Sequence, residues 1–295
     1  MQFVSGMGGT SSDIPTSGQV DSSGNSYVAG LFQGTADFDP GAGTTNLTSA
    51  GANDIFIAKY DSSGALVWAK GVGGTSNDSN VALQIDSSGN SYVTGYFSGT
   101  ADFDPGAGTT NLTSAGGNDT FIAKYDSSGA LVWAKGIGGT SSDIAASMQI
   151  DSGGNSYLIG TFQGTADFDP GAGTTNLTSA GGNDVFIAKY DSTGAMVWAK
   201  NVGGTSSDTG SSIAVDSNGN SYVAGTFEGT ADFDPGAGTT NLTSAGDTDL
   251  FIAKYDSTGA LVWAKNAGGT DTDQAASVTV DSSGNSYVTG IFTGT

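Results

Sequence analysis

Residues 81–139 read VALQIDSSGNSYVTGYFSGTADFDPGAGTTNLTSAGGNDTFIAKYDSSGALVWAKGIGG, and this stretch decides the fold because it recurs almost letter for letter along the chain. The phenylalanine of its ADFDPGAG segment recurs at a constant step of 65 residues, at Phe38, Phe103, Phe168 and Phe233. A period of this length indicates a repeat architecture, in which each unit buries its apolar faces against its neighbours. We therefore expect one repeat domain over residues 1–295, with units near 10–74, 75–139, 140–204 and 205–269 and terminal pieces 1–9 and 270–295.

Each unit contains four short runs of alternating apolar residues, which predict four β-strands. In the quoted stretch the predicted strands are 81–85, 91–97, 120–125 and 130–138. DSSGN at 86–90 and DSSG at 126–129 have the composition of tight hairpin turns, with glycine supplying the positive φ. The third and fourth strands carry apolar residues on both faces, so each sheet must be covered on both sides. This requirement favours an all-β propeller of four-stranded blades over a β-helix, whose period is shorter, or a sandwich, which would not repeat identically.

Three segments resemble the bacterial β-propeller repeat family called SBBP. They are DSSGNSYVTG at 86–95, FIAKYD at 121–126 and GALVWAKGVGG at 64–74, and their copies cover essentially the whole chain. The resemblance implies the propeller fold and a secreted or cell-surface location in bacteria, often as repeats within a larger protein. It implies little about activity, because one fold carries many functions.

The two ends of the chain predict an incomplete fifth blade. MQFVSGMGG at 1–9 aligns with the fourth strand of a unit, and the last residues align with a unit that stops after its second strand. A ring would close with 278–292 and 3–8 in one split blade that lacks a strand, so a strand edge would be open to another molecule. We expect this edge to support a homo-oligomer or a filament; the alternative is that the chain is a segment of a longer repeat protein. The expected assembly residues are Phe3, Val4, Tyr287, Val288, Ile291 and Phe292.

The charge of the chain narrows its partners. Eight lysines oppose 29 acidic residues, which gives a formal net charge of −21, and there is no arginine or histidine. We expect no nucleic-acid partner and no anionic membrane, because no basic patch exists to bind phosphates. No apolar run approaches the roughly 18 residues of a spanning helix, and no signal peptide precedes Gln2, so a secreted form would have lost its leader.

The same composition argues against an enzyme. Without histidine, cysteine or arginine, only paired carboxylates could act as acid and base, and these pairs recur in every unit whereas an active site is usually unique.

The ADFDPGAG segment suggests a cation site. In a propeller this connection shares a rim with the connection between successive units, and two carboxylates at i and i+2 can point at one hard cation. We expect Ca²⁺ rather than Mg²⁺, with Asn46 or Asp54 completing the irregular shell. The predicted metal ligands are Asp37, Asp39, Asp102, Asp104, Asp167, Asp169, Asp232 and Asp234. The alternative is purely structural: Asp39, Pro40 and Gly41 would form a type II turn, and Phe38 would plug the segment into the core.

Other repeated residues have simpler interpretations. The aspartates of the DSSGN turns are expected to hold those turns, and the lysines to be solvated charges near aspartates. The tryptophan of VWAK and the tyrosine of SYV are expected to pack between blades, with stacking on sugars as the alternative for the aromatic residues. NLT at Asn46, Asn111, Asn176 and Asn241 matches the glycosylation acceptor pattern.

Taken together, the sequence predicts a non-enzymatic extracellular structural protein, a surface or matrix scaffold that self-assembles through its terminal strands. The alternative is a calcium-dependent propeller that binds a glycan or a protein in adhesion.

Overall fold

A computed structural model describes residues 6–293, which fall into two compact units divided between Gly136 and Ile137. All the regular structure of the described residues is β-strand, joined by turns. The first unit contains β1 (Gly8–Gly9), β2 (Asp13–Val20), β3 (Ser26–Asp37), β4 (Asn46–Tyr60), β5 (Leu66–Gly74), β6 (Ser79–Ile85), β7 (Ser91–Phe97), β8 (Thr100–Asp102), β9 (Asn111–Thr113) and β10 (Asp119–Tyr125), and β11 (Leu131–Gly139) begins in it. Among these residues no helix is long and apolar enough to cross a bilayer.

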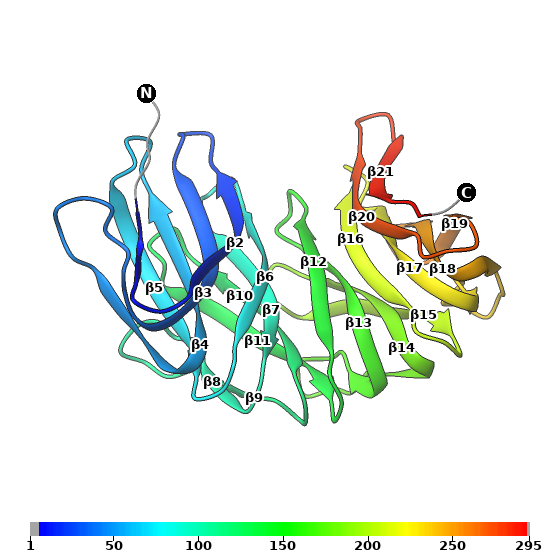
Figure 1. Ribbon diagram of the computed structural model, residues 1–295, viewed down its shortest axis with the longest axis horizontal. Helices are drawn as coiled ribbons and strands as arrows, with labels where there is room; N and C mark the ends of the chain where they lie inside the picture. Colours follow the sequence, from blue (N-terminus) through cyan, green and yellow to red (C-terminus); the bar gives the residue numbers. More distant parts are fainter. Residues whose placement is uncertain (1–5, 294–295) are drawn as a thin grey trace. The chain divides into compact units, whose positions relative to one another are not determined.

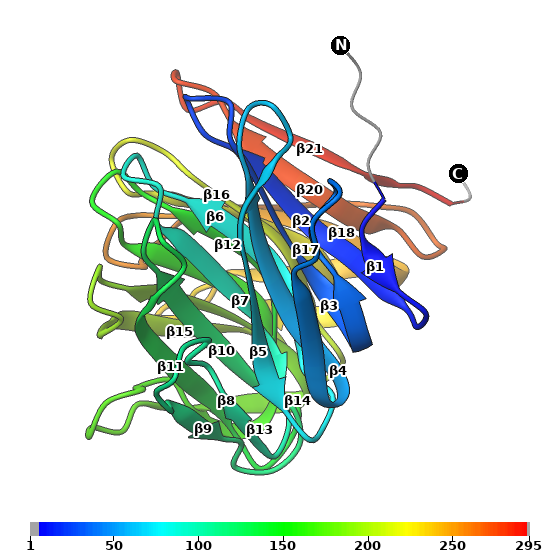
Figure 2. The same cartoon turned by 90° about the vertical axis from the view of Figure 1, so that its left-hand side faces the viewer.

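The second unit continues the same pattern of antiparallel strands. It contains β12 (Ile144–Ile150), β13 (Ser156–Asp167), β14 (Asn176–Tyr190), β15 (Met196–Gly204), β16 (Thr209–Val215), β17 (Ser221–Asp232), β18 (Asn241–Tyr255), β19 (Leu261–Ala267), β20 (Gln274–Val280) and β21 (Ser286–Ile291). Within it β12, β13, β14 and β15 pair in chain order, as do β16, β17, β18 and β19 (Figure 1). The first unit repeats the pattern in β2–β5, and β7, β10 and β11 run side by side (Figure 2). The four predicted strands per repeat are confirmed.

The paired strands of each repeat are joined by the tight turns that the sequence predicted. Gly219, in the turn between β16 and β17, has φ of 78°, and Gly259, in the turn between β18 and β19, has φ of 80°. These values lie in the left-handed region, which glycine enters without a steric cost.

Residues 98–119, in which the sequence predicts no strand, contain a β-hairpin, and this corrects the prediction. The second and third strands of a repeat continue past a bulge at Gly164, whose φ is 71°, and pair again from Thr165↔Thr178 to Asp167↔Asn176. We call these extensions the tip hairpins; they comprise residues 35–48, 100–113, 165–178 and 230–243. Their short TAD and NLT runs alternate around Ala166 and Leu177, a pattern too brief to be recognised beside so many turn-forming residues.

Successive repeats are joined by hydrogen-bonded strands, which the sequence analysis did not anticipate. The end of β15 pairs with the tip hairpin of the next repeat, with Gly203 opposite Asp232 and Gly204 opposite Ala231. The same register joins β5 to β8 and β11 to β13. A Cβ on Gly204 would lie 2.2 Å from the carbonyl oxygen of Thr230, so only glycine permits this approach.

Apolar residues are buried on both faces of the inner strands, as expected for a sheet covered on both sides. Val185, Phe186, Ile187 and Ala188 follow one another in β14 and are each at most 1% exposed. Side chains of β13 and β14 share one core cluster with residues of β16, β17 and β18. Neighbouring repeats therefore bury each other's sheets, which is the packing of propeller blades.

The terminal pieces keep the geometry of the repeats to which they correspond. β1 pairs with β3, Gly8 opposite Asp37, in the register that β15 makes with β17. Pro15 lies at a bulge in β2, which pairs only with β3 among the described strands, so the proline occupies an edge strand, where a missing N–H is tolerated. At the other end β20 and β21 form a two-stranded sheet.

Candidate functional site

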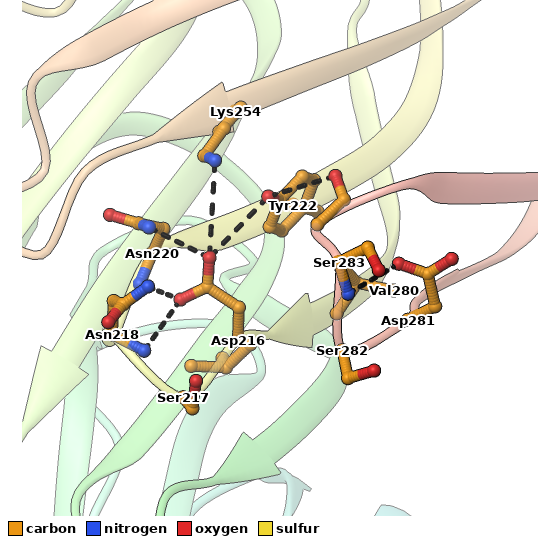
Figure 3. A pocket seen from close by; sticks show the side chains of 12 residues that line it. Asp216, Ser217, Asn218, Asn220, Tyr222, Lys254, Val280, Asp281, Ser282 and Ser283 are labelled. Carbon is orange, nitrogen blue, oxygen red and sulfur yellow. Dashed lines mark hydrogen bonds and ion pairs between the residues drawn. The ribbon is translucent and has the colours of Figure 1, made fainter.

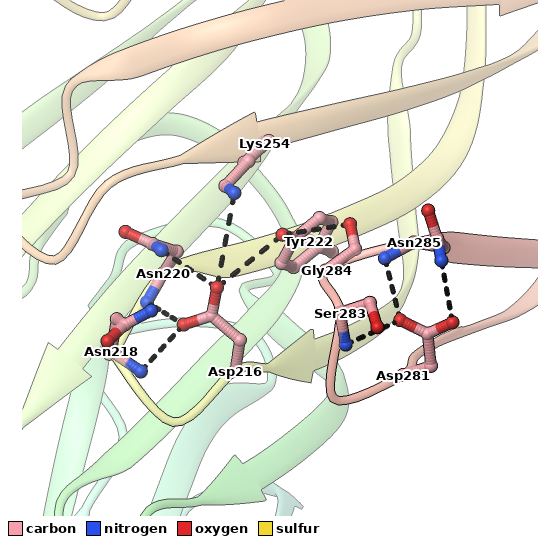
Figure 4. Close-up of polar contacts among 9 residues, drawn as sticks. All are labelled: Asp216, Asn218, Asn220, Tyr222, Lys254, Asp281, Ser283, Gly284 and Asn285. Atoms are coloured by element: carbon pink, nitrogen blue, oxygen red, sulfur yellow. Dashed lines mark hydrogen bonds and ion pairs between the residues drawn. The ribbon is translucent and has the colours of Figure 1, made fainter.

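The first candidate site is built on the DSSGN-type turns, at the end of the strands that we call the turn end. In the turn at 216–220 the Asp216 Oδ1 accepts hydrogen bonds from the amides of Asn218 (2.9 Å) and Asn220 (3.0 Å). Its Oδ2 accepts one from Asn220 Nδ2 (2.8 Å) and lies 4.0 Å from Lys254 Nζ (Figure 4). Burial raises the pKa of Asp216, but the hydrogen bonds of Asn220 and Asn218 and the charge of Lys254 outweigh it, so this pKa is lowered.

Lys254 also covers an aromatic ring. Its ammonium lies 4.7 Å from the centre of the Tyr222 ring, because strand register places the two residues opposite each other on β18 and β17. Lys59, Lys124 and Lys189 make the same contact with Tyr27, Tyr92 and Tyr157. The predicted pairing of lysine with aspartate is found for Lys124 and Lys254, but the contact with the tyrosine ring was missed.

A groove runs between the turns of successive repeats. It has a volume of about 330 Å³ and is lined by polar residues of both turns, among them Asp216, Asn218, Tyr222, Lys254, Asp281 and Ser283 (Figure 3). The Tyr222 hydroxyl crosses it and donates to the carbonyl oxygen of Gly284 at 3.3 Å. A similar groove of about 390 Å³ separates the turn at 151–155 from the turn at 216–220.

These contacts make the turn end a clamp between repeats. Tyr27 bonds to the carbonyl of Gly89 in the same way, and the indole N–H of Trp198 donates to the carbonyl of Ser257 in the next repeat at 3.1 Å. The prediction that these tyrosines and tryptophans pack between blades is confirmed. Since the Asp216 carboxylate is used by its own turn and by Lys254, the groove offers a ligand mainly hydroxyl and amide groups.

The predicted metal ligands lie at the other end of the strands, the hairpin end. Asp37 Oδ1 accepts from the amides of Asp39 (3.0 Å) and Thr45 (2.8 Å), and Asp39 Oδ1 accepts from the amide of Gly41 (2.8 Å). The copies at 102 and 104, 167 and 169, and 232 and 234 make the same bonds. These hydrogen bonds lower the pKa of Asp37. Both aspartates therefore organise the tip of the hairpin.

The structural alternative for this segment is right in one part and wrong in another. Phe38 is 2% exposed and packs against Phe32 and Phe56, with ring centres 5.8 and 4.8 Å away, so it does plug the tip into the core. The type II turn is wrong, because Gly41 does not have the positive φ that this turn requires. The aspartate side chain caps the turn instead.

A calcium ion would find only part of a coordination shell at these tips. Each carboxylate pair already has one oxygen of each residue engaged by amides, and within the described part of the chain no three acidic side chains cluster around a point that could hold a metal. Asn46 is paired with Asp37 along the hairpin, whereas Asp54 lines a groove of about 300 Å³ with Asp102 and Asp104 of the following repeat. Calcium binding stays a prediction, with the preceding repeat as the source of a third carboxylate.

A second class of aspartate lies at the hairpin end, and among its members only Asp54 was a candidate ligand in the sequence. Asp54, Asp78, Asp184 and Asp208 are each at most 4% exposed. Their signal in the sequence is weak: an aspartate stands two residues before FIAKY in all four repeats, and the connections between repeats carry another.

The residues predicted to mediate assembly are only partly described. Phe3 and Val4 lie outside the described residues. Tyr287, Ile291 and Phe292 are 56%, 62% and 62% exposed, and Val288 packs on a small cluster with Ala275 and Val278. Tyr222, the equivalent of Tyr287 in the preceding repeat, is fully buried, so β21 presents the surface that a third strand covers elsewhere.

Comparison with known proteins places the repeats in a family. The family model of the SBBP β-propeller repeat matches residues 197–226 and 262–290, each of which covers a VWAK strand and the following DSSGN-type hairpin. The chain carries SBBP β-propeller repeats. These SBBP repeats agree with the four-stranded sheets and the buried faces described above.

The relatives extend well beyond this chain. An uncharacterised WD repeat-containing protein of Acanthamoeba polyphaga mimivirus is 29% identical over 67% of the chain and 16% of its own length. The regulatory protein FlaEY of Caulobacter vibrioides is 28% identical over 63% of the chain and 20% of its own length. The chain thus spans about a fifth or less of the length of these relatives. A solved protein of unknown function from Bacteroides caccae, 11% identical, covers 81% of the chain and 94% of its own with a TM-score of 0.21, which carries no argument about the fold.

Proposed function

We propose that the SBBP chain is a non-enzymatic structural repeat protein that acts as a scaffold at a bacterial surface or in an extracellular matrix. The observation that carries the proposal is the repeated junction. The strand pairing Gly203↔Asp232 recurs as Gly73↔Asp102 and Gly138↔Asp167, and the tyrosine and tryptophan clamps recur at the turn end. Because the strand pairing recurs in the same register, further units can be added by the same contacts. The extracellular location rests on the family resemblance.

The proposal extends to the arrangement of the terminal pieces. β1 has the register of a fourth strand, and β20 with β21 has that of a first and second strand. These pieces would contribute to a split fifth blade or join the corresponding pieces of another molecule. The exposed edge and side chains of β21 support the second route, since a strand edge of this kind pairs readily with another strand.

Self-association is tested by light scattering and electron microscopy over a wide range of protein concentration. Concentration-dependent oligomers or filaments support the scaffold, and Ile291→Lys should suppress them by placing a charge on the edge strand. Val262→Lys, at an equally apolar and 52% exposed position of β19, is the matched control. Compact monomers alone at the highest concentrations would overturn assembly through β21.

The grooves at the turn end favour a second candidate function, adhesion by binding a glycan or a protein. Serine, asparagine and lysine side chains line them beside a tyrosine, and such groups can hydrogen-bond to hydroxyls. A glycan array probed with and without Ca²⁺ tests this function. Saturable binding that weakens in Asn218→Ala would support it, and an array without any bound glycan would count against it.

A further inference from the structure

The strand β21 has the same sequence as β7 but lacks one of the neighbours that β7 has. Residues 86–95 and 281–290 both read DSSGNSYVTG. β7 pairs with β6 on one side and with β10 on the other, whereas β21 pairs only with β20 among the strands that the structure describes. The surroundings of β7 therefore show what a further strand beside β21 would contact.

The open side of β21 exposes residues that are buried in β7. Tyr92 and Thr94 of β7 are fully buried. Their copies in β21 are Tyr287, which is 56% exposed, and Thr289, which is exposed, as is the adjacent Gly290. An edge strand also presents unpaired backbone N–H and C=O groups, which can pair with another strand.

The glycine of the second strand in a repeat forms a slot for a phenylalanine ring. Gly225 of β17 lies opposite Phe251 of β18, and a Cβ on this glycine would lie 2.7 Å from Cε1 of the ring. Gly160 and Phe186 make the same contact, with 2.6 Å between the corresponding atoms. The nearest atoms to a Cβ on Gly290 all belong to β20, so on β21 the slot lacks its ring.

The tyrosine and the aspartate of the same hairpin form a seat for a lysine. Lys124 of β10 lies opposite Tyr92, with its ammonium 4.7 Å from the ring centre and 4.0 Å from Asp86 Oδ2. Beside β21 the Tyr287 hydroxyl donates to Asp281 Oδ2 at 3.1 Å, so a ring and a carboxylate are held together there as well. The lysine–tyrosine contacts among the described residues all involve other tyrosines. An ammonium placed here would gain both a ring face and a carboxylate.

Thr289 adds a polar contact that distinguishes β7 and β21 from the other second strands. Its copy Thr94 donates from Oγ1 to the carbonyl oxygen of Phe121 in β10 at 2.6 Å. Alanine or isoleucine stands at this position in the other three repeats. The strand that fits β21 best is therefore one with the sequence of β10.

We propose that residues 281–291, the β21 site, bind one kind of strand, a third strand of the type DTFIAKY from another SBBP chain. The inference rests on the proposed assembly through β21 and names the partner. The bound strand runs antiparallel to β21, with its phenylalanine opposite Gly290, its isoleucine opposite Thr289 and its lysine opposite Tyr287, as β10 does on β7. The third strands β4, β10, β14 and β18 are each paired with a second strand, so the occupant is a third strand that another chain leaves free.

A fourth strand fits the β21 site less well. Within a repeat the fourth strands β15 and β19 pair with the third strands β14 and β18 and not with the second. Their VWAK sequence also has no phenylalanine for the slot at Gly290. A peptide of a fourth strand is therefore the competing ligand in the test.

The experiment measures the binding of a fluorescent peptide with the sequence of residues 117–126, GNDTFIAKYD, to the intact chain. We expect saturable binding by fluorescence anisotropy at protein concentrations at which light scattering shows a monomer. Amide hydrogen exchange with mass spectrometry locates the peptide, which should slow the exchange of residues 286–291. An absence of binding, protection confined to other strands, or tighter binding of the fourth-strand peptide 131–139 would each overturn the proposal.

Variants of the peptide test the register without any risk to the fold of the protein. The change Phe121→Ala in the peptide should weaken binding by roughly ten-fold or more, because the ring fills the slot at Gly290. Lys124→Met should weaken it by roughly two- to five-fold, because the contact with the ring and the carboxylate of the hairpin is lost. Asn118→Ala, outside the paired residues of β10, is the matched control and should bind as the parent peptide does. Equal affinities of the parent peptide and Phe121→Ala would overturn the proposal.

A change in the protein completes the test. Tyr287→Ala, at an exposed position, should weaken binding of the parent peptide, and Val262→Ala, at a 52% exposed position of β19, should not. Oligomers or filaments of the chain without any peptide binding would overturn this inference and leave the scaffold standing. Peptide binding by a chain that stays monomeric at every concentration would support this inference and count against self-assembly.

Discussion

Asp208 and Asp216, which flank the two ends of β16, have opposite surroundings. At the turn end Asp216 receives two backbone amides, a side-chain amide and a lysine, and its pKa is lowered. At the hairpin end Asp208 is buried with other carboxylates for neighbours, and its pKa is raised. The surroundings thus favour the anion of aspartate at one end of β16 and disfavour it at the other. Burial and the number of hydrogen-bond donors set the direction of the pKa shift.

The largest expected effect tests whether the hairpin end depends on its apolar anchor. Phe233 is 1% exposed and packs on Phe227 and Phe251, with ring centres 5.5 and 4.9 Å away. Phe233→Ala should lower the free energy of unfolding by about 3–5 kcal/mol, because it leaves a cavity below the tip hairpin. Chemical denaturation measures this loss. A cost below that of Asp216→Ala would show that the hairpin end is held by its polar bonds instead.

The second-largest expected effect concerns how tightly the buried carboxyl of Asp184 packs against Gly203. Gly203→Ala would place a methyl group 2.6 Å from the carboxyl carbon of Asp184, so this carboxyl must move. We expect a loss of about 1–3 kcal/mol in thermal or urea unfolding. Gly153→Ser is the control, because serine stands at the equivalent turn positions Ser23 and Ser88. Equal stability of the two variants would mean that the carboxyl of Asp184 is loosely packed against Gly203.

A smaller effect is expected at the turn end, with a pH dependence of opposite sign. Asp216→Ala removes the acceptor of the turn amides and should cost about 1–2 kcal/mol at pH 7. Since the folded pKa of Asp216 is lowered, its contribution is present above pH 3.8 and is lost as the pH falls through the lower folded value. The difference in the free energy of unfolding between Asp216→Ala and the wild type should therefore become smaller in acid. A difference that becomes larger in acid would contradict the conclusion that Asp216 stabilises its turn as an anion.

Calcium should have the smallest effect. One oxygen of each tip carboxylate already accepts an amide, so an ion would gain few ligands from the hairpin. We expect millimolar Ca²⁺ to raise the melting temperature of the wild type slightly, and less in Asp102→Asn with Asp104→Asn. A chelator that changes nothing would argue against calcium at the tips, and a shift that survives both substitutions would place the ion elsewhere.

Much of the fold was predictable because the same sequence pattern occurs four times in the chain. The strands, the turn glycines such as Gly219 and the packing role of Tyr222 all follow from local patterns of a few residues. The tip hairpins were missed because their strands are only three residues long. The bulge at Gly164 also leaves no mark in the alternation of apolar and polar residues. Of the candidate sites, the Asp37 and Asp39 positions were found, but their use as turn caps depends on bonds within the folded hairpin.

The sequence by itself determined the period, the four strands of each repeat and the acidic, arginine-free surface, because these depend on order and composition along the chain. Only the tertiary structure decided that β15 pairs with the next tip hairpin, and that Asp54 meets Asp78 beside Gly73. The physical reason is distance along the chain: residues about 25 apart come together only when neighbouring sheets pack, and burial then sets whether an aspartate is stable with or without its proton.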